Sequence, residues 1–132
     1  MGIVWRCILG GGDIVFPKKN DLSTSIRKLG VTHVSLVPTQ LLRLLKKKPD
    51  IRTLKNLKCI LLGGAPIPDD LLSKAKRLKL PVYMTYGLTE MASQVATSRK
   101  PCGPLRVLKY RELKIVKGEI LVRGPILFRG YI

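Results

Sequence analysis

The chain repeats one pattern three times, in which a short apolar run ends at a glycine or a proline. The runs cover residues 31–37, 58–62 and 80–84, and the turns that follow them contain Pro38, Gly63 and Gly87. Amphipathic stretches with leucines at helical spacing lie between the runs. This alternation predicts an α/β fold, a parallel sheet with flanking helices. Because parallel strands end at one edge of a sheet, we expect the three turns to border one crevice.

Capping residues and helix breakers place the remaining elements. We expect a helix capped by Asp21 or Ser23 that runs to Leu29, and a second capped by Thr39 that ends at the lysines 46–48 and Pro49. A short turn or helical piece is expected at 54–57, followed by a helix that begins at Asp69 and Asp70. A last helix is expected after Glu90, carrying Met91, Ala92 and Val95. Residues 13–16 are apolar and end at Pro17, which predicts a short buried strand.

The pattern changes after residue 100. Residues 113–124 alternate in the manner of two strands that turn around Lys117 and Gly118, which predicts a β-hairpin. We therefore divide the chain into a partial α/β subdomain, 1–100, and a partial all-β subdomain, 101–132.

The charge balance points to polyanionic partners. With 25 Lys and Arg against 8 Asp and Glu, the formal net charge is +17, which attracts nucleic acids, nucleotide phosphates or anionic membranes. The basic residues are spread through the chain without an Arg-rich tail, and its one Trp, four Tyr and two Phe offer few surfaces for stacking bases. Specific nucleic-acid binding is therefore not expected.

The cysteines and the apolar runs favour a cytoplasmic protein. Cys7, Cys59 and Cys102 are widely separated and form no CxxC pair, so we expect reduced structural thiols. Arg6 and Asp13 interrupt the apolar N-terminal stretch, which argues against a signal peptide. No apolar run is long enough for a membrane span.

Two turns carry candidate binding residues, and each has two interpretations. Gly63 and Gly64 would let backbone amides approach a flat ring or a phosphate, but a strand that reverses into a helix needs glycine as well. Thr89 could donate to a phosphoryl oxygen while Glu90 binds magnesium. A capped helix with an acidic first turn explains the same two residues, so the residues alone leave both alternatives open.

His33 is the only histidine and lies inside an apolar run. A histidine in this position is more often a hydrogen-bonded core residue than a ligand or base, so the run itself favours a structural role. No serine or cysteine has a sequence arrangement typical of a nucleophile, and no Walker-type phosphate loop is present.

Four segments, in order, resemble the adenylate-forming acyl-CoA synthetase superfamily. They are residues 32–40 (THVSLVPTQ), 62–68 (LGGAPIP), 86–93 (YGLTEMAS) and 118–124 (GEILVRG) with Gly130 and Tyr131. Within that superfamily the sequence of these segments is most similar to the o-succinylbenzoate-CoA ligases of menaquinone synthesis. The resemblance covers essentially the whole chain and matches the middle to later part of the family's large N-terminal domain.

The resemblance implies a role for each matching residue. Gly63, Gly64, Ala65 and Pro66 would border the adenine and the acyl group, and His33 would line the acyl pocket. Tyr86 would flank the adenine, Gly87 and Leu88 would lie near the reacting carboxylate, Thr89 would contact phosphate and Glu90 would hold magnesium. Ser93 and Gln94 come just after this turn, at positions where the subfamilies differ in how they contact the acyl substrate. Gly118 and Glu119 would have a structural role.

The implied reaction joins a carboxylate to ATP with Mg²⁺, releases pyrophosphate, and passes the acyl group from the adenylate to coenzyme A. The family's phosphate loop, ribose-binding aspartate, hinge and C-terminal lysine have no counterpart here. We therefore expect a partial ligase that is inactive alone, with the missing parts of the same ligase as its partners and homo-oligomer formation left open. The alternatives are another acyl- or aryl-CoA ligase, or a non-catalytic module that binds nucleotides or polyanions.

Overall fold

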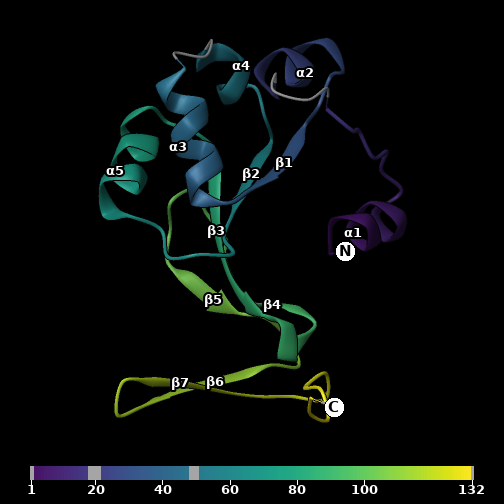
Figure 1. Ribbon diagram of the computed structural model, residues 1–132, viewed down its shortest axis with the longest axis vertical. Helices are drawn as coiled ribbons and strands as arrows, with labels where there is room; N and C mark the ends of the chain where they lie inside the picture. The colour runs from purple at the N-terminus through teal and green to yellow at the C-terminus, as the bar shows by residue number, and fades with distance from the viewer. Residues whose placement is uncertain (1, 18–21, 48–50, 132) are drawn as a thin grey trace.

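The computed structural model describes residues 2–17, 22–47 and 51–131, and its centre is one mixed sheet (Figure 1). In spatial order the strands are β1 (His33–Leu36), β2 (Cys59–Leu62), β3 (Val82–Leu88), β4 (Ser93–Ser98) and β5 (Leu105–Val107). Strands β1, β2 and β3 run parallel, whereas β4 and β5 join antiparallel. The predicted parallel sheet with flanking helices is confirmed, and antiparallel strands extend it.

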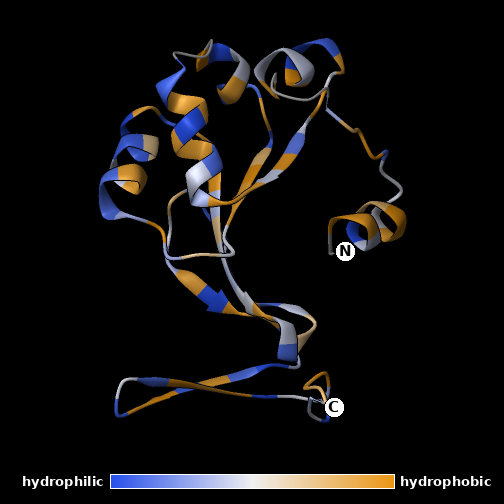
Figure 2. Cartoon of the chain, viewed as in Figure 1, coloured by the Kyte–Doolittle hydropathy of each residue, from blue (hydrophilic) through white to orange (hydrophobic). Residues whose placement is uncertain are grey.

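Four helices lie around the parallel strands: α2 (Leu22–Lys28), α3 (Pro38–Lys46), α4 (Ile51–Lys55) and α5 (Asp69–Arg77). Figure 2 shows apolar stripes on α3 and α5, which follow from leucines three and four residues apart. Leu41 of α3, Leu62 of β2 and Val82 of β3 are fully buried in one core cluster. Burial of these apolar side chains supplies the main driving force for this half of the fold.

The predicted cap of α3 was wrong by two residues. The N-cap is Val37, and Pro38 occupies the first turn, where its missing N–H costs no hydrogen bond. The side-chain Oε1 of Gln40 accepts a hydrogen bond from the Val37 amide at 3.0 Å. The predicted cap at Asp21 and the helix end at Lys48 and Pro49 lie outside the described residues.

The predicted helix after Glu90 was also wrong. Strand β3 continues through Gly87 to Leu88, a 3-10 turn covers Thr89–Met91, and β4 begins at Ser93. Ala92 and Ser93 have φ values of 52° and 115°, and such left-handed backbone cannot continue a right-handed helix.

The predicted buried strand at residues 13–16 was wrong as well. These residues form an irregular, exposed segment, with Phe16 83% exposed. They have no strand to pair with among the residues that the structure describes. The segment follows α1 (Gly2–Gly10), which Figure 1 shows set apart from the other helices.

The predicted hairpin is confirmed. Strands β6 (Glu112–Val116) and β7 (Glu119–Arg123) pair antiparallel around Lys117 and Gly118. The main sheet itself reaches Val107, and the division of the chain at residue 100 stays a prediction. Across 2–17, 22–47 and 51–131, each helix is too short or too polar to be a membrane span.

Candidate active site

Gly63 directly follows the carboxyl end of β2, where it contacts both the end of β1 and strand β3. The Gly63 amide donates a hydrogen bond to the Leu36 carbonyl at 3.3 Å. A side chain at Gly63 would collide with the backbone and methyl group of Thr85 on β3. Gly64 follows with φ of 80°. The close packing of β2 against β3 therefore requires glycine at 63, and the turn conformation favours glycine at 64.

A small cavity of about 250 Å³ opens at this junction. Its lining includes Ser35, Gly63, Gly64, Thr85, Ser93 and Gln94. Three of the predicted site residues, Gly63, Gly64 and Ser93, therefore border one space. The cavity lies at the predicted edge, where the strands end, but neither Pro38 nor Gly87 is part of its lining.

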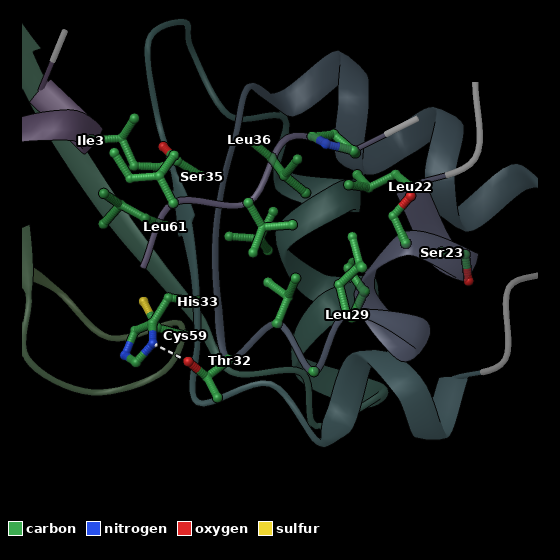
Figure 3. Close-up of a pocket in the computed structure, with 18 of the residues that line it drawn as sticks. Ile3, Leu22, Ser23, Leu29, Thr32, His33, Ser35, Leu36, Cys59 and Leu61 are labelled. Carbon is green, nitrogen blue, oxygen red and sulfur yellow. Dashed lines mark hydrogen bonds between the residues drawn. The ribbon is translucent and has the colours of Figure 1, made fainter. Parts of the chain in front are cut away.

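A larger groove of about 1410 Å³ adjoins this cavity, and residues of α1, α2, α3, β1 and β2, together with Gln94 of β4, line it. His33 and Cys59 lie next to each other on paired strands in this groove (Figure 3). The His33 ring is exposed, and its Nδ1 lies 2.8 Å from the Thr32 hydroxyl oxygen. The expectation of a core histidine was therefore wrong, because β1 turns this side chain into the groove rather than into the core. Burial raises the pKa of the Cys59 thiol, partly offset by Arg6.

Arg6 of α1 reaches across both spaces. Its Nη1 donates to the Gln94 Oε1 at 2.6 Å, and Arg6 lines the cavity and the groove. In the sequence, Arg6 is only a break in an apolar run. Because Arg6 is exposed, its place in the chain carried no signal of its contact with Gln94, which is 88 residues away.

The turn at Glu90 lies outside the cavity lining. The Glu90 Oε1 accepts a hydrogen bond from the Tyr131 hydroxyl at 2.6 Å, and the Glu90 carbonyl accepts one from the Phe128 amide at 2.8 Å. The Tyr131 hydrogen bond, helped by the Glu90 backbone N–H, lowers the pKa of the Glu90 carboxyl. The same contact raises the pKa of Tyr131. Glu90 is thus ionised at neutral pH.

The remaining predicted residues surround this region without lining the cavity. Ala65 and Pro66 lie in the exposed loop between β2 and α5, and Thr89 is exposed in the 3-10 turn. Tyr86 and Leu88 are partly buried on β3. No side-chain cap hydrogen bond forms at the 3-10 turn and no α-helix follows it. The capped-helix explanation of Thr89 and Glu90 was therefore wrong.

The model of the AMP-binding enzyme family matches residues 1–132. The chain belongs to this family. It is 38% identical to the 2-succinylbenzoate–CoA ligase of Escherichia coli K12 over 98% of its length, and 41% identical to the Haemophilus influenzae ligase of the same name, also over 98%. It covers 28% and 29% of those proteins. The chain thus spans less than a third of the relatives that it matches.

Solved structures of AMP-binding enzymes agree with the fold. The o-succinylbenzoate CoA synthetase of Bacillus subtilis, in complex with the acyl-adenylate intermediate OSB-AMP, matches with a TM-score of 0.80 and 30% identity, over 98% of this chain and 30% of that one. The Escherichia coli MenE with a bound analogue of OSB-AMS matches with a TM-score of 0.77 and 38% identity, over 98% and 28% of the two chains. The family resemblance predicted from the four segments is confirmed.

The turn after β3 offers only part of the ligand set that a magnesium ion bound with ATP would need. One solved Bacillus subtilis relative is a complex with ATP and magnesium. In the described part of this chain, no group of three or more His, Cys, Asp or Glu side chains could hold a metal ion. Glu90 supplies one ionised carboxylate, and Thr89 beside it supplies an exposed hydroxyl. Mg²⁺ is commonly held by one or two carboxylates, with substrate phosphates and water completing the shell.

Proposed function

We propose that this chain forms part of the active site of an AMP-forming carboxylate–CoA ligase whose substrate is o-succinylbenzoate. The reaction would activate the carboxylate with ATP to an acyl adenylate and transfer the acyl group to coenzyme A, a step of menaquinone synthesis. Similarity to 2-succinylbenzoate–CoA ligases over 98% of the chain supports this substrate. The three free cysteines support a cytoplasmic location.

The observation that carries the proposal is the cavity at the Gly63 junction. Gly64 in its lining has no side chain to block it, so a flat ring or a phosphate can approach the backbone there. Gly64, Ala65 and Pro66 would border the adenine and the acyl group, with Tyr86 flanking the ring. Binding of the reactants in one place is itself a large part of catalysis in such a transfer reaction.

The turn after β3 would serve the reacting groups. Gly87 and Leu88 would lie near the carboxylate that is activated, and the Thr89 hydroxyl would donate to a phosphoryl oxygen. Glu90 would hold Mg²⁺, which offsets the charge on the phosphates when bound. The basic surface of the chain would favour the approach of ATP and coenzyme A, both polyanions.

The groove suits an acyl group with two carboxylates. One carboxylate of o-succinylbenzoate reacts and the other stays ionised, so its pocket needs a cation. Arg6 contacts Gln94 and provides a guanidinium in the groove that His33 also lines, and Arg side chains bind carboxylates strongly through paired hydrogen bonds. An acyl-CoA ligase for a substrate with a single carboxylate would have no use for this cation.

Binding of OSB-AMS to the purified chain, measured by ligand-observed NMR, tests the proposal. We expect weak binding that Gly64→Asn abolishes, because a side chain at 64 would project beside Val37 at the cavity, while asparagine tolerates the φ of 80° there. Gly118→Asn is the matched control, since it changes a glycine on the remote hairpin, where asparagine tolerates the positive φ. Without the other parts of such a ligase, we expect no pyrophosphate release from ATP and o-succinylbenzoate. Equal binding by the wild type and Gly64→Asn would contradict the proposed site.

The positive charge supports a second candidate function, a non-catalytic module that binds nucleotides or other polyanions. Basic residues gather in the last turns of α3 and α5, among them Arg43, Lys46, Lys74, Lys76 and Arg77. Binding to these basic helix ends would weaken steeply with added salt and would not depend on the acyl group. OSB-AMS binding that equals AMP binding and vanishes in high salt would favour this second function.

A further inference from the structure

We propose that Gln94 is a positioning residue that fixes the Arg6 guanidinium in the groove, so that the site selects acyl groups carrying a second negative charge. This inference rests on the proposed function and adds a residue whose role the family resemblance left undefined. Gln94 is half-buried on β4, and it contacts Arg6 through Oε1 and two threonines through Nε2.

A bulge brings these groups onto one face of the sheet. Opposite β4, Tyr86 pairs with Ala96 and Gly87 pairs with Gln94, so Val95 has no partner residue in β3. An extra residue changes the alternation of side chains along a strand and redirects those on one side of it. Gln94 and Thr97, three residues apart, therefore lie on the same face and form a hydrogen bond of 3.0 Å.

The donor and the acceptor of each hydrogen bond around Gln94 can be assigned in a consistent way. The Thr97 hydroxyl donates to the Thr85 hydroxyl oxygen at 3.4 Å, and the Thr85 hydroxyl donates to the Ala96 carbonyl at 3.3 Å. Because each hydroxyl has one proton, both threonine oxygens are left as acceptors. The Gln94 Nε2 donates to both, at 2.9 Å to Thr85 and 3.0 Å to Thr97.

This arrangement decides what Gln94 presents to Arg6. With both amide protons used by the threonines, only Oε1 faces the groove, and a guanidinium, which has donors and no acceptor, is its matching partner. One Arg6 nitrogen is held at 2.6 Å, and its remaining N–H groups can meet a carboxylate. Gln94 is neutral, so the guanidinium keeps its full charge for the ligand.

Gln94→Glu tests the selectivity. The glutamate has the same shape but pairs with Arg6 and cancels its charge. The two probes are OSB-AMS and the analogue that lacks the aryl carboxylate, and the readout is the ratio of their affinities. We expect the wild type to prefer OSB-AMS, and Gln94→Glu to reduce the preference roughly tenfold by weakening one charge-assisted contact. Asn56→Asp, the same charge change at an exposed residue outside both cavities, should leave the ratio unchanged.

A measurement without ligand tests the positioning. Rotation of the Arg6 guanidinium, measured by ¹⁵N NMR of the arginine side chains, should be slow in the wild type and faster in Thr97→Val, which removes one acceptor from Gln94. Arg106, exposed on β5, is an internal reference for free rotation. Free rotation of Arg6 in the wild type, or no change in Thr97→Val, would overturn the role of Gln94.

The binding results separate the two proposals. A wild type that binds both analogues equally, or a Gln94→Glu variant with an unchanged ratio, would overturn the selectivity, while the proposed ligase function would stand. A wild type that binds neither analogue would count against the proposed function, and the rotation of Arg6 would still decide whether Gln94 positions it.

Discussion

In the α/β part of the chain Leu62 and Val82 are completely buried, whereas in the hairpin β6–β7 Ile115 leaves 67% of its surface exposed. The first region has a core to which three strands and several helices contribute. The hairpin is held together by the backbone pairing of its two strands and by an ion pair between Arg123 and Glu112, which is exposed. Exposed ion pairs contribute little to stability. Stability should therefore respond to substitutions in the two regions very differently.

The largest expected effect comes from the core. Leu62→Ala should lower the free energy of unfolding by about 2–5 kcal/mol, because it removes buried methyl groups and leaves a cavity. Urea denaturation followed by circular dichroism measures the loss. Leu121→Ala in β7 is the matched control, since that side chain is 49% exposed and should cost well under half as much. Similar losses for both variants would show that the hairpin is as well packed as the core.

A smaller effect is expected at Gly87, where β3 and β4 of the main sheet approach closely. A side chain at 87 would overlap the Ser93 carbonyl, so Gly87→Ala must open the bulge between β3 and β4, at a cost of about 1–3 kcal/mol. Gly10→Ala is the control, because no atom lies near its position and alanine suits a helix better than glycine. A thermal midpoint for Gly87→Ala equal to that of the wild type would contradict the close contact.

The same contrast explains which parts of the fold could be predicted from the sequence. Apolar spacing predicted the buried leucines of α3 and the parallel strands, because burial in a layered fold imposes a local period. Residues 13–16 have a similar composition but form no strand, since pairing depends on a neighbour and not on composition. The left-handed Ala92 and Ser93 lie in a segment whose residue types favour a helix, and the tight contact at Gly87 overrides that preference.

The candidate site also contains residues that could be predicted from the sequence and residues that could not. Gly63 and Gly64 could be found because they are contiguous and follow a strand. Arg6 and Gln94 are 88 residues apart, and only the folded chain brings them together. Their pairing has no sequence period, so the residue that the groove offers to a second carboxylate could not be inferred before the strands were placed.

The smallest expected effect concerns the contact that joins the turn after β3 to the end of the hairpin region. Tyr131→Phe removes the hydroxyl that lowers the pKa of Glu90, so the pKa of Glu90 should rise toward its ordinary value. ¹³C NMR titration of the Glu90 carboxyl measures this change. Tyr110→Phe removes a phenol from another exposed tyrosine and should leave the titration of Glu90 unchanged.

The pH dependence of stability follows from the sign of these shifts. A carboxyl whose pKa is lowered by folding stabilises the fold above its unfolded pKa, about 4.3, and the contribution is lost as the pH falls through the lower folded value. The raised pKa of Tyr131 acts oppositely, so its contribution is present below pH 10.0, the ordinary value, and is lost as the pH rises beyond it. The wild type should therefore exceed Tyr131→Phe in stability between these limits and converge with it in acid. A difference that persists in strong acid would mean that the hydroxyl stabilises the turn without the charge of the carboxylate, because phenylalanine keeps the ring contact with Phe128, whose ring lies 4.7 Å away.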